Sequence, residues 1–262
     1  MLTIVDLWNR PYRLNHRHFH VFAEDGIKIA GVHLAPHKSE TLILYVHGFM
    51  SGKNHRRVPE FVEACSAFTD IMAIDLRGHG DSEGGSTMSE REVLDVDATI
   101  TYARSLGYQR IIAVGSSMGG ATVIRHAALY QNVDAVATIG AFADPKSIRW
   151  PTTDAGLRLL YTTGQIGQTW SYVTRKTRLD RLPHHDDPPY MLVDRIAPRP
   201  LLLIHGEWDP TVHPNSAKML FARAQEPKEV VMVPRAGHDH PHLNATTAKR
   251  VQAWLQKHKI LT

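Results

Sequence analysis

The 262-residue chain has almost no cysteine, no long apolar run and no strong excess of one charge. Its single cysteine, Cys65, excludes an intrachain disulfide, and it falls in a helical apolar pattern that indicates core packing. No apolar stretch approaches the roughly 20 residues that a membrane-spanning helix needs. Residues 1–10 lack the basic-then-apolar order of a secretion signal. We therefore expect a cytoplasmic protein with no stable membrane insertion.

The charge balance gives no sign of a macromolecular partner. Lysine and arginine number 30 against 26 aspartate and glutamate residues, a formal net charge of +4. The basic residues form no continuous stripe, which a nucleic-acid-binding protein is expected to show, so we expect no nucleic-acid partner. With neither internal repeats nor low-complexity segments, and with a hydrophobic fraction of 43%, residues 1–262 are predicted to form one domain. The oligomeric state stays open.

The chain does contain short apolar runs that alternate with helical patterns, as βαβ units and a mainly parallel sheet require. An Asp-Gly pair within residues 24–26 predicts a β-hairpin. Residues 142–197 break the rhythm with many prolines and aromatics, and we interpret them as an insertion with a helical stretch at 156–161. The predicted strands are 18–23, 27–34, 41–46, 71–74, 111–114, 135–139, 201–204 and 229–233. The predicted helices are 59–68, 120–129, 215–224, one that ends near 258, and one capped by Ser89 with an apolar stripe at Val93, Val96, Ile100 and Ala103.

The run Gly115-Ser116-Ser117-Met118-Gly119 lies between a predicted strand and a predicted helix. A serine with glycine two residues before and after it, at such a turn, is typical of a nucleophile elbow. The strained backbone that exposes the hydroxyl brings both flanking positions too close to their neighbours for a Cβ. The helix N-terminus also directs its N–H groups at the serine. We predict that Ser117 is a nucleophile; the alternative is a serine that only caps the helix.

A serine hydroxyl becomes nucleophilic only beside a base that takes its proton and an anion that orients that base. In parallel sheets such groups lie at the carboxyl ends of strands. Asp209 follows the predicted strand 201–204 and precedes Pro210, so we predict that it is the acid. The alternatives are that Glu207 takes this role or that Asp209 only begins a turn.

The predicted base follows the strand 229–233. His238 comes directly after Gly237, which lets the backbone turn so that the imidazole can reach back across the strand ends. His240 and His242 follow closely and are alternatives for the same role.

His47-Gly48-Phe49 follows the predicted strand 41–46 at the same edge. The backbone N–H groups of Phe49 and Met118 are predicted to point at the oxygen that becomes negative during acyl transfer, where each such donor lowers the barrier by roughly 3 kcal/mol. Gly48 allows the backbone to approach a substrate, and His47 is expected to orient the loop by hydrogen bonding.

The run from Asp75 to Ser82 contains two glycines that mark a tight loop at a strand end. We expect Asp75 and Arg77 to form a charge pair that holds this loop beside the elbow. This role is structural rather than catalytic.

His16, His18 and His20 alternate along a predicted strand, a spacing that can bind a metal. No carboxylate or cysteine cluster accompanies them, so we interpret them as part of a polar edge strand. Serine-based acyl transfer needs no metal or cofactor, and we expect no cofactor, no cofactor-binding residue and no metal site.

Five runs occur in order between residues 20 and 258: His-Gly-Phe, Asp-Leu-Arg-Gly-His-Gly-Asp-Ser, Gly-Ser-Ser-Met-Gly-Gly, Gly-Glu-Trp-Asp-Pro and Ala-Gly-His. In these runs and in the order serine, acid, histidine, the chain resembles the α/β-hydrolase superfamily, in its serine esterase, monoglyceride lipase and serine aminopeptidase-like group. The resemblance does not specify a substrate, because the superfamily varies its lid to support many reactions. It implies an α/β fold with a mostly parallel eight-stranded sheet flanked by helices, a catalytic triad of Ser117, Asp209 and His238, an oxyanion hole from Phe49 and Met118, and a short lid over 142–197.

These residues predict a carboxylesterase-like serine hydrolase that cleaves small or medium-sized carboxylic esters through an acyl-enzyme intermediate. The substrate would be a small-molecule ester of undetermined acyl length and leaving group. A peptidase, for which Asp180, Asp186 and Asp187 could bind a free amino terminus, and a carbon–carbon bond hydrolase would use the same triad. From another class, a catalytically silent ligand-binding protein is an alternative, against which the complete triad argues.

Overall fold

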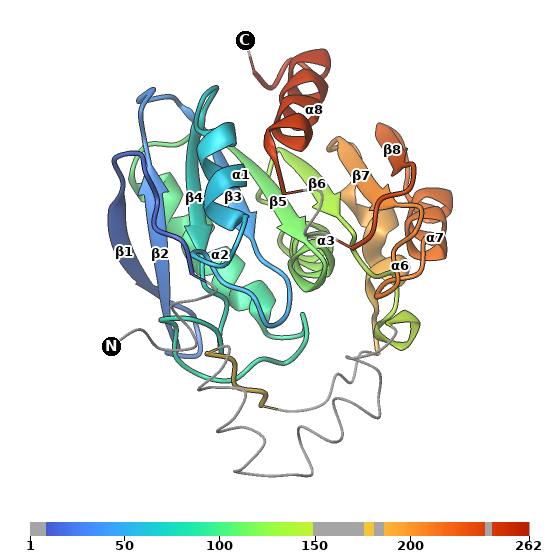
Figure 1. The fold of residues 1–262 in the computed structure, drawn as a ribbon, viewed down its shortest axis with the longest axis horizontal. Helices are drawn as coiled ribbons and strands as arrows, with labels where there is room; N and C mark the ends of the chain where they lie inside the picture. The colour runs from blue at the N-terminus through green and yellow to red at the C-terminus, as the bar shows by residue number, and fades with distance from the viewer. Residues whose placement is uncertain (1–8, 149–175, 181–185, 239–242, 262) are drawn as a thin grey trace.

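The computed structural model describes residues 9–148, 176–180, 186–238 and 243–261. These residues form one eight-stranded sheet with helices packed around it (Figure 1). The strand order is β1-β2-β4-β3-β5-β6-β7-β8. The β1–β2 and β2–β4 pairs are antiparallel, and the other neighbouring pairs are parallel. The strands are β1 (Arg17–Phe22), β2 (Lys28–Leu34), β3 (Thr41–Val46), β4 (Asp70–Ile74), β5 (Arg110–Ser116), β6 (Ala135–Ile139), β7 (Leu201–Gly206) and β8 (Lys228–Val233). The predicted fold, a mostly parallel eight-stranded sheet, is confirmed.

The amount of apolar sequence in each strand follows its place in the sheet. Five neighbouring strands, β4, β3, β5, β6 and β7, are buried along their length apart from Arg110, because helices cover both of their faces. At one edge, β1 alternates between exposed and buried residues, as predicted for a polar edge strand. The predicted hairpin is also confirmed: Gly26 has φ +80°, and the Ala23 N–H donates to the Ile27 carbonyl across the turn.

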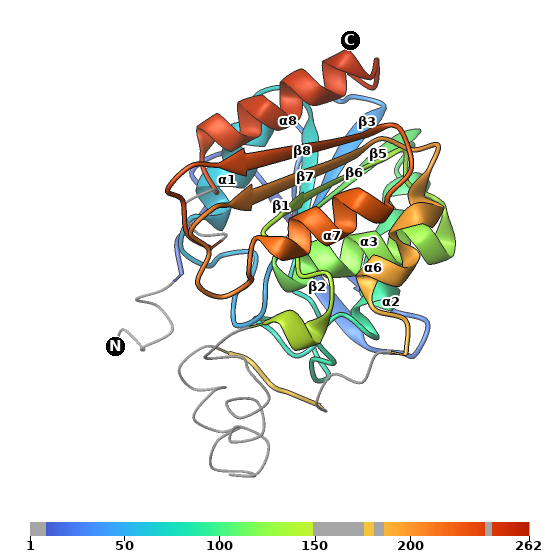
Figure 2. The same cartoon turned by 90° about the vertical axis from the view of Figure 1, so that its right-hand side faces the viewer.

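Helices pack on both faces of the sheet (Figure 2). Helices α1 and α8 share one apolar cluster with the sheet, and α2, α3 and α7 share the other. Cys65 is fully buried in the first cluster, which confirms the predicted core packing. No helix in the described part of the chain combines the length and apolarity needed to cross a membrane. The helical segments are α1 (Val58–Cys65), α2 (Glu92–Ser105), α3 (Met118–Tyr130), η1 (Pro145–Ser147), α6 (Pro189–Leu192), η2 (Val193–Ile196), α7 (Asn215–Arg223) and α8 (Ala245–Lys257).

The start of α2 differs from the sequence prediction. The predicted cap, Ser89, lies outside the helix, which begins at Glu92. The buried Glu92 carboxylate instead accepts hydrogen bonds from the backbone N–H groups of Thr87 and Ser89 at 2.8 and 2.9 Å. Ser89 lies three residues before the helix, with φ +82°, and Arg91 takes the cap position without a side-chain hydrogen bond.

Most of the predicted lid over 142–197, including the helix expected at 156–161, lies outside the described residues. The described residues on either side of 149–175 contact loops at the carboxyl edge of the sheet. Ile148 forms an antiparallel bridge with Val212, and residues 176–180 pair with the loop that follows β4.

The parallel strands all point in the same direction, so the residues that follow them share one edge of the sheet. Phe49 follows β3, Ser117 and Met118 follow β5, Asp209 follows β7, and His238 follows β8. The fold therefore brings these residues to one rim.

Candidate active site

Ser117 lies at a sharp turn between β5 and α3 and has φ +50° and ψ −116°. A Cβ added at Gly115 would collide with the Gly119 carbonyl, and one added at Gly119 would collide with the Val46 carbonyl. The Ser117 N–H donates to the Ile139 carbonyl at 2.8 Å, which fixes the turn against β6. This close packing accounts for the glycines on both sides of the serine and holds an unfavourable backbone conformation.

His238 lies between Ser117 and Asp209. Its Nε2 is 2.9 Å from the Ser117 Oγ, and its Nδ1 is 2.6 Å from the Asp209 Oδ2. Because a carboxylate only accepts hydrogen bonds, Nδ1 carries the proton and Nε2 can accept the proton of the serine hydroxyl. The side chains predicted as nucleophile, base and acid thus form one hydrogen-bonded chain, although they come from three distant segments.

Asp209 is fixed from several sides. Its Oδ1 accepts the backbone N–H groups of Thr211 and Val212, each at 2.8 Å, and its side chain is fully buried. Burial alone would raise the pKa of Asp209, but hydrogen bonds from His205 and His238 hold that pKa well below its usual range. The carboxylate therefore stays ionised beside the imidazole.

The alternatives from the sequence lie elsewhere or outside the described residues. Glu207 is exposed, and its backbone N–H donates to the Val233 carbonyl. Of the two acidic residues after β7, the structure places Asp209 against the imidazole. His240 and His242 lie outside the described residues.

Two residues of this site were not singled out from the sequence. Gly140 follows β6 with φ +64°, and a Cβ there would come within 3.4 Å of the His238 Nδ1. His205, in β7, has its Nε2 3.4 Å from the Asp209 Oδ2. In the sequence, Gly140 could have been noticed as a glycine directly after a predicted strand. His205 could have been noticed as a lone polar residue at the end of an apolar run.

The Phe49 N–H lies on the loop after β3, and the Met118 N–H lies at the start of α3, which packs against that loop. Met118 is the first residue of α3, and Gly119 packs against the carbonyls of Val46 and His47. Within the described part of the chain, neither N–H group donates a hydrogen bond to another protein group. The Met118 N–H belongs to the first turn of α3, where helix N–H groups lack intrahelical partners, and lies at the positive end of the helix dipole.

His47 orients its loop by hydrogen bonding, as expected. The Leu76 N–H donates to its Nε2 at 3.0 Å, and its Nδ1 lies 2.7 Å from the Gly48 carbonyl oxygen, so the proton is on Nδ1. Burial, with a smaller contribution from nearby His79, lowers the pKa of His47 to about 3. The ring is fully buried and neutral, and it ties the loop after β3 to the loop after β4.

The expected charge pair between Asp75 and Arg77 is wrong. Asp75 accepts the Lys53 ammonium at 2.6 Å and the Lys53 backbone N–H at 2.7 Å. Arg77 instead bonds to Asp95 and Asp25 at 2.7 and 2.6 Å. The reason is geometric: the Asp75 carboxylate faces the loop after β3, whereas Arg77 faces α2 and the β1–β2 turn.

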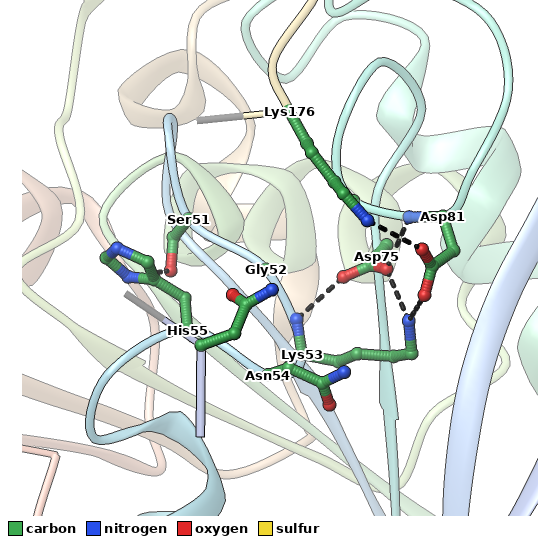
Figure 3. A pocket seen from close by; sticks show the side chains of 10 residues that line it. Ser51, Gly52, Lys53, Asn54, His55, Asp75, Asp81 and Lys176 are labelled. Atoms are coloured by element: carbon green, nitrogen blue, oxygen red, sulfur yellow. Dashed lines mark hydrogen bonds and ion pairs between the residues drawn. The ribbon is translucent and has the colours of Figure 1, made fainter. Parts of the chain in front are cut away.

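The Lys53 ammonium lies between the carboxylates of Asp75 and Asp81 (Figure 3). Lys176, from the returning end of the insertion, contacts Asp81 at 3.3 Å. A cavity of about 70 Å³ opens beside this cluster, with Ser51 among its lining residues. Three segments that are distant in sequence are thus joined by paired charges beside the loop that carries Phe49.

The described residues contain no group of three or more histidine, cysteine, aspartate or glutamate side chains arranged to hold a metal ion. His18 and His20 are exposed on β1. Burial raises the pKa of the Cys65 thiol, so this cysteine is a packing residue rather than a nucleophile.

The chain is similar to known proteins both in sequence and in fold. A sequence model of the alpha/beta hydrolase family matches residues 43–250. The uncharacterized protein YfhR of Salmonella typhi is 24% identical over 234 residues, which cover 82% of this chain and 72% of that protein. The Pyrococcus furiosus esterase Pf2001 superposes with a TM-score of 0.71 at 19% identity, over 95% of this chain and 98% of its own. The esterase domain of a Rhodothermus marinus protein gives a TM-score of 0.67 at 22% identity, over 93% and 99%.

Proposed function

Because the chain belongs to the alpha/beta hydrolase family, we propose that it is a serine hydrolase that cleaves small or medium-sized carboxylic esters through an acyl-enzyme intermediate. The observation that carries the proposal is the position of the His238 imidazole, 2.9 Å from the Ser117 Oγ and 2.6 Å from the Asp209 Oδ2. Two proteins of similar fold, from Pyrococcus furiosus and Rhodococcus, are named esterases, which supports the choice of substrate class.

In the proposed reaction, the His238 Nε2 takes the hydroxyl proton while the Ser117 Oγ attacks the ester carbonyl carbon. The negative oxygen of the tetrahedral intermediate accepts hydrogen bonds from the Phe49 and Met118 N–H groups. The imidazolium, stabilised by Asp209, then gives its proton to the leaving alkoxide. Water activated by the same imidazole attacks the acyl-enzyme, which releases the acid and restores the serine.

The electrostatics around Asp209 support this sequence of steps. Asp209 remains ionised across the pH range in which an ordinary imidazole, with a pKa near 6.5, gains and loses a proton. The carboxylate can therefore stabilise the imidazolium that forms in each half of the reaction without taking its proton.

A fluorophosphonate probe tests the nucleophile. Wild-type protein is expected to be labelled, and Ser117→Ala is expected to remain unlabelled. Ser116→Ala is a matched control because this neighbouring serine is buried and its Oγ lies 2.9 Å from the Tyr45 hydroxyl. Labelling that survives Ser117→Ala, or that disappears in Ser116→Ala alone, would refute the assignment.

Substrate class is tested with p-nitrophenyl esters of two to sixteen carbons beside matching p-nitroanilides. We expect turnover of the shorter esters and little turnover of the amides. Of the acidic residues considered for a peptidase, Asp187 already accepts the Arg125 guanidinium at 3.0 Å, which weakens its case as an amine-binding group. A burst of p-nitrophenol without subsequent turnover would indicate a ligand-binding protein instead.

A further inference from the structure

A second histidine lies behind the candidate acid. His205 is in β7, four residues before Asp209, and is 1% exposed. Its Nε2 lies 2.9 Å from the Val212 carbonyl oxygen and 3.4 Å from the Asp209 Oδ2. Because the Val212 carbonyl oxygen only accepts, Nε2 carries a hydrogen and donates it to that oxygen. The Asp209 Oδ2 lies within ion-pair distance of the same N–H group.

This contact fixes both the carboxylate and the turn that carries it. The Asp209 Oδ1 is held by two backbone N–H groups, those of Thr211 and Val212, but they leave Oδ2 to be placed by side chains. Oδ2 faces the His238 Nδ1 at 2.6 Å on one side and the His205 Nε2 on the other. The hydrogen bond from His205 to the Val212 carbonyl also holds the turn that carries Asp209 against β7.

The environment of His205 favours a role beyond packing. The preceding β7 residues are leucine or isoleucine and are buried, so an apolar side chain would suit this strand. A buried imidazole is costly unless its N–H groups find acceptors, and here the acceptors belong to the acid and its turn. His205 is not itself the base, because its Nε2 faces this turn.

We propose that His205 is a positioning residue that holds the Asp209 carboxylate in the plane in which Oδ2 accepts the His238 N–H. The inference rests on the proposed function. Without this contact, the carboxylate is less restrained against rotation about its Cβ–Cγ bond, and the imidazole is held less firmly in the orientation in which Nε2 meets the Ser117 hydroxyl. Misplacement of a reacting group by about 1 Å can lower a rate roughly 100-fold.

The test compares His205→Leu, which removes the N–H, with His205→Gln, whose amide can reach the same acceptors. The measurements are kcat and KM on a p-nitrophenyl ester, normalised to active sites by fluorophosphonate titration, with a melting curve for each variant. We expect His205→Leu to lower kcat by about 10-fold to 100-fold, with KM within about twofold of wild type. His205→Gln is expected to recover kcat to within about threefold. The expected pattern is thus a kcat effect that the polar replacement rescues.

Leu203→Ala is the matched control, since Leu203 is equally buried in β7. It is expected to lower the melting temperature and to leave kcat per active site unchanged. If His205→Leu does not fold, His205→Asn replaces it, because the shorter amide keeps polarity without the reach. Wild-type kcat in His205→Leu, or equal losses in the Leu and Gln variants, would overturn the positioning role. Absence of wild-type labelling and turnover would instead overturn the proposed function.

Discussion

The cluster around Ser117 and the cluster around Lys53 lie at the same edge of the sheet but use charge differently. In the first, the His238 side chain is 18% exposed and joins a hydroxyl to a carboxylate. In the second, Lys53 and Asp75 are each 2% exposed, and the ammonium bonds to two carboxylates. The first arrangement can transfer a proton between the Ser117 Oγ and the His238 Nε2 while Asp209 stays ionised. The second can only hold its loops in place, because its charges are permanently paired.

The two clusters are therefore expected to respond differently to substitution. Changes in the first should affect turnover more than stability, and changes in the second should affect stability more than turnover. A variant that reverses either pattern would show that the two clusters are not separate in function.

The largest effect is expected for Asp209→Asn, which we expect to lower kcat by about 1,000-fold to 10,000-fold. The amide presents an N–H to His238, so the Nδ1 becomes an acceptor and the proton moves to Nε2. The imidazole can then no longer take the Ser117 proton. Steady-state hydrolysis of a p-nitrophenyl ester measures the loss, and a melting curve is expected to show a smaller change in stability.

Glu207→Gln is the matched control for Asp209→Asn. Glu207 is exposed and lies two residues away, and the same change of carboxylate to amide is expected to alter kcat by less than about twofold. A large loss in Glu207→Gln together with a small loss in Asp209→Asn would exchange the roles of the two acids.

Lys53→Met tests the second cluster and is expected to lower the free energy of unfolding by about 3 kcal/mol or more. The buried Asp75 carboxylate would keep its backbone donors but lose its main counter-charge. Lys53→Met combined with Asp75→Asn is expected to recover part of this loss, because no buried charge is then left uncompensated but the amide NH2 replaces the acceptor of one backbone N–H. Urea unfolding measures both variants.

The kcat of Lys53→Met distinguishes a structural role for Lys53 from a catalytic one. The protein that remains folded without urea is expected to have a kcat within about tenfold of wild type. Among the residues described, Lys53 forms no hydrogen bond or ion pair with Ser117, Asp209 or His238. A greater loss of kcat without loss of stability would place Lys53 with the reacting groups.

The sequence predicted the sheet well because buried strands and helices leave distinct apolar periods. It also led to the hypothesis that Ser117, Asp209 and His238 act together, since each lies shortly after a strand and their order along the chain is informative. The structure brings these three side chains within hydrogen-bonding distance. The partners of Asp75 were not predictable in this way. Lys53 lies 22 residues before Asp75, and only the pairing of β3 with β4 brings the two together.

His205 and Gly140 were missed for a related reason. Each is unremarkable in the sequence, and each matters because of what the fold places next to it. The contact of Gly140 with His238 joins two strand ends and depends on strand order, which apolar periodicity does not determine. The contact of His205 with Asp209 is local and depends on the path of the turn after β7.

The smallest expected effect concerns pH and the buried ring of His47. Because the pKa of His47 is about 3 in the folded protein, against about 6.5 for a free imidazole, the unfolded chain binds a proton at this position between these values while the folded chain does not. Stability from this residue is therefore complete above about pH 6.5 and falls as the pH is lowered. Each pH unit in this window costs about 1.4 kcal/mol, or about 2 kcal/mol by pH 5.

His47→Gln isolates this contribution, because the amide cannot take up a proton at any of these pH values. The free energy of unfolding in urea is measured at pH 7 and pH 5 for both proteins, so that histidines remote from His47 contribute equally to each. We expect wild type to lose about 2 kcal/mol more than His47→Gln between the two pH values. Equal losses would mean that His47 is protonated in the folded protein, and the hydrogen bond from the Leu76 N–H to its Nε2 would then be wrong.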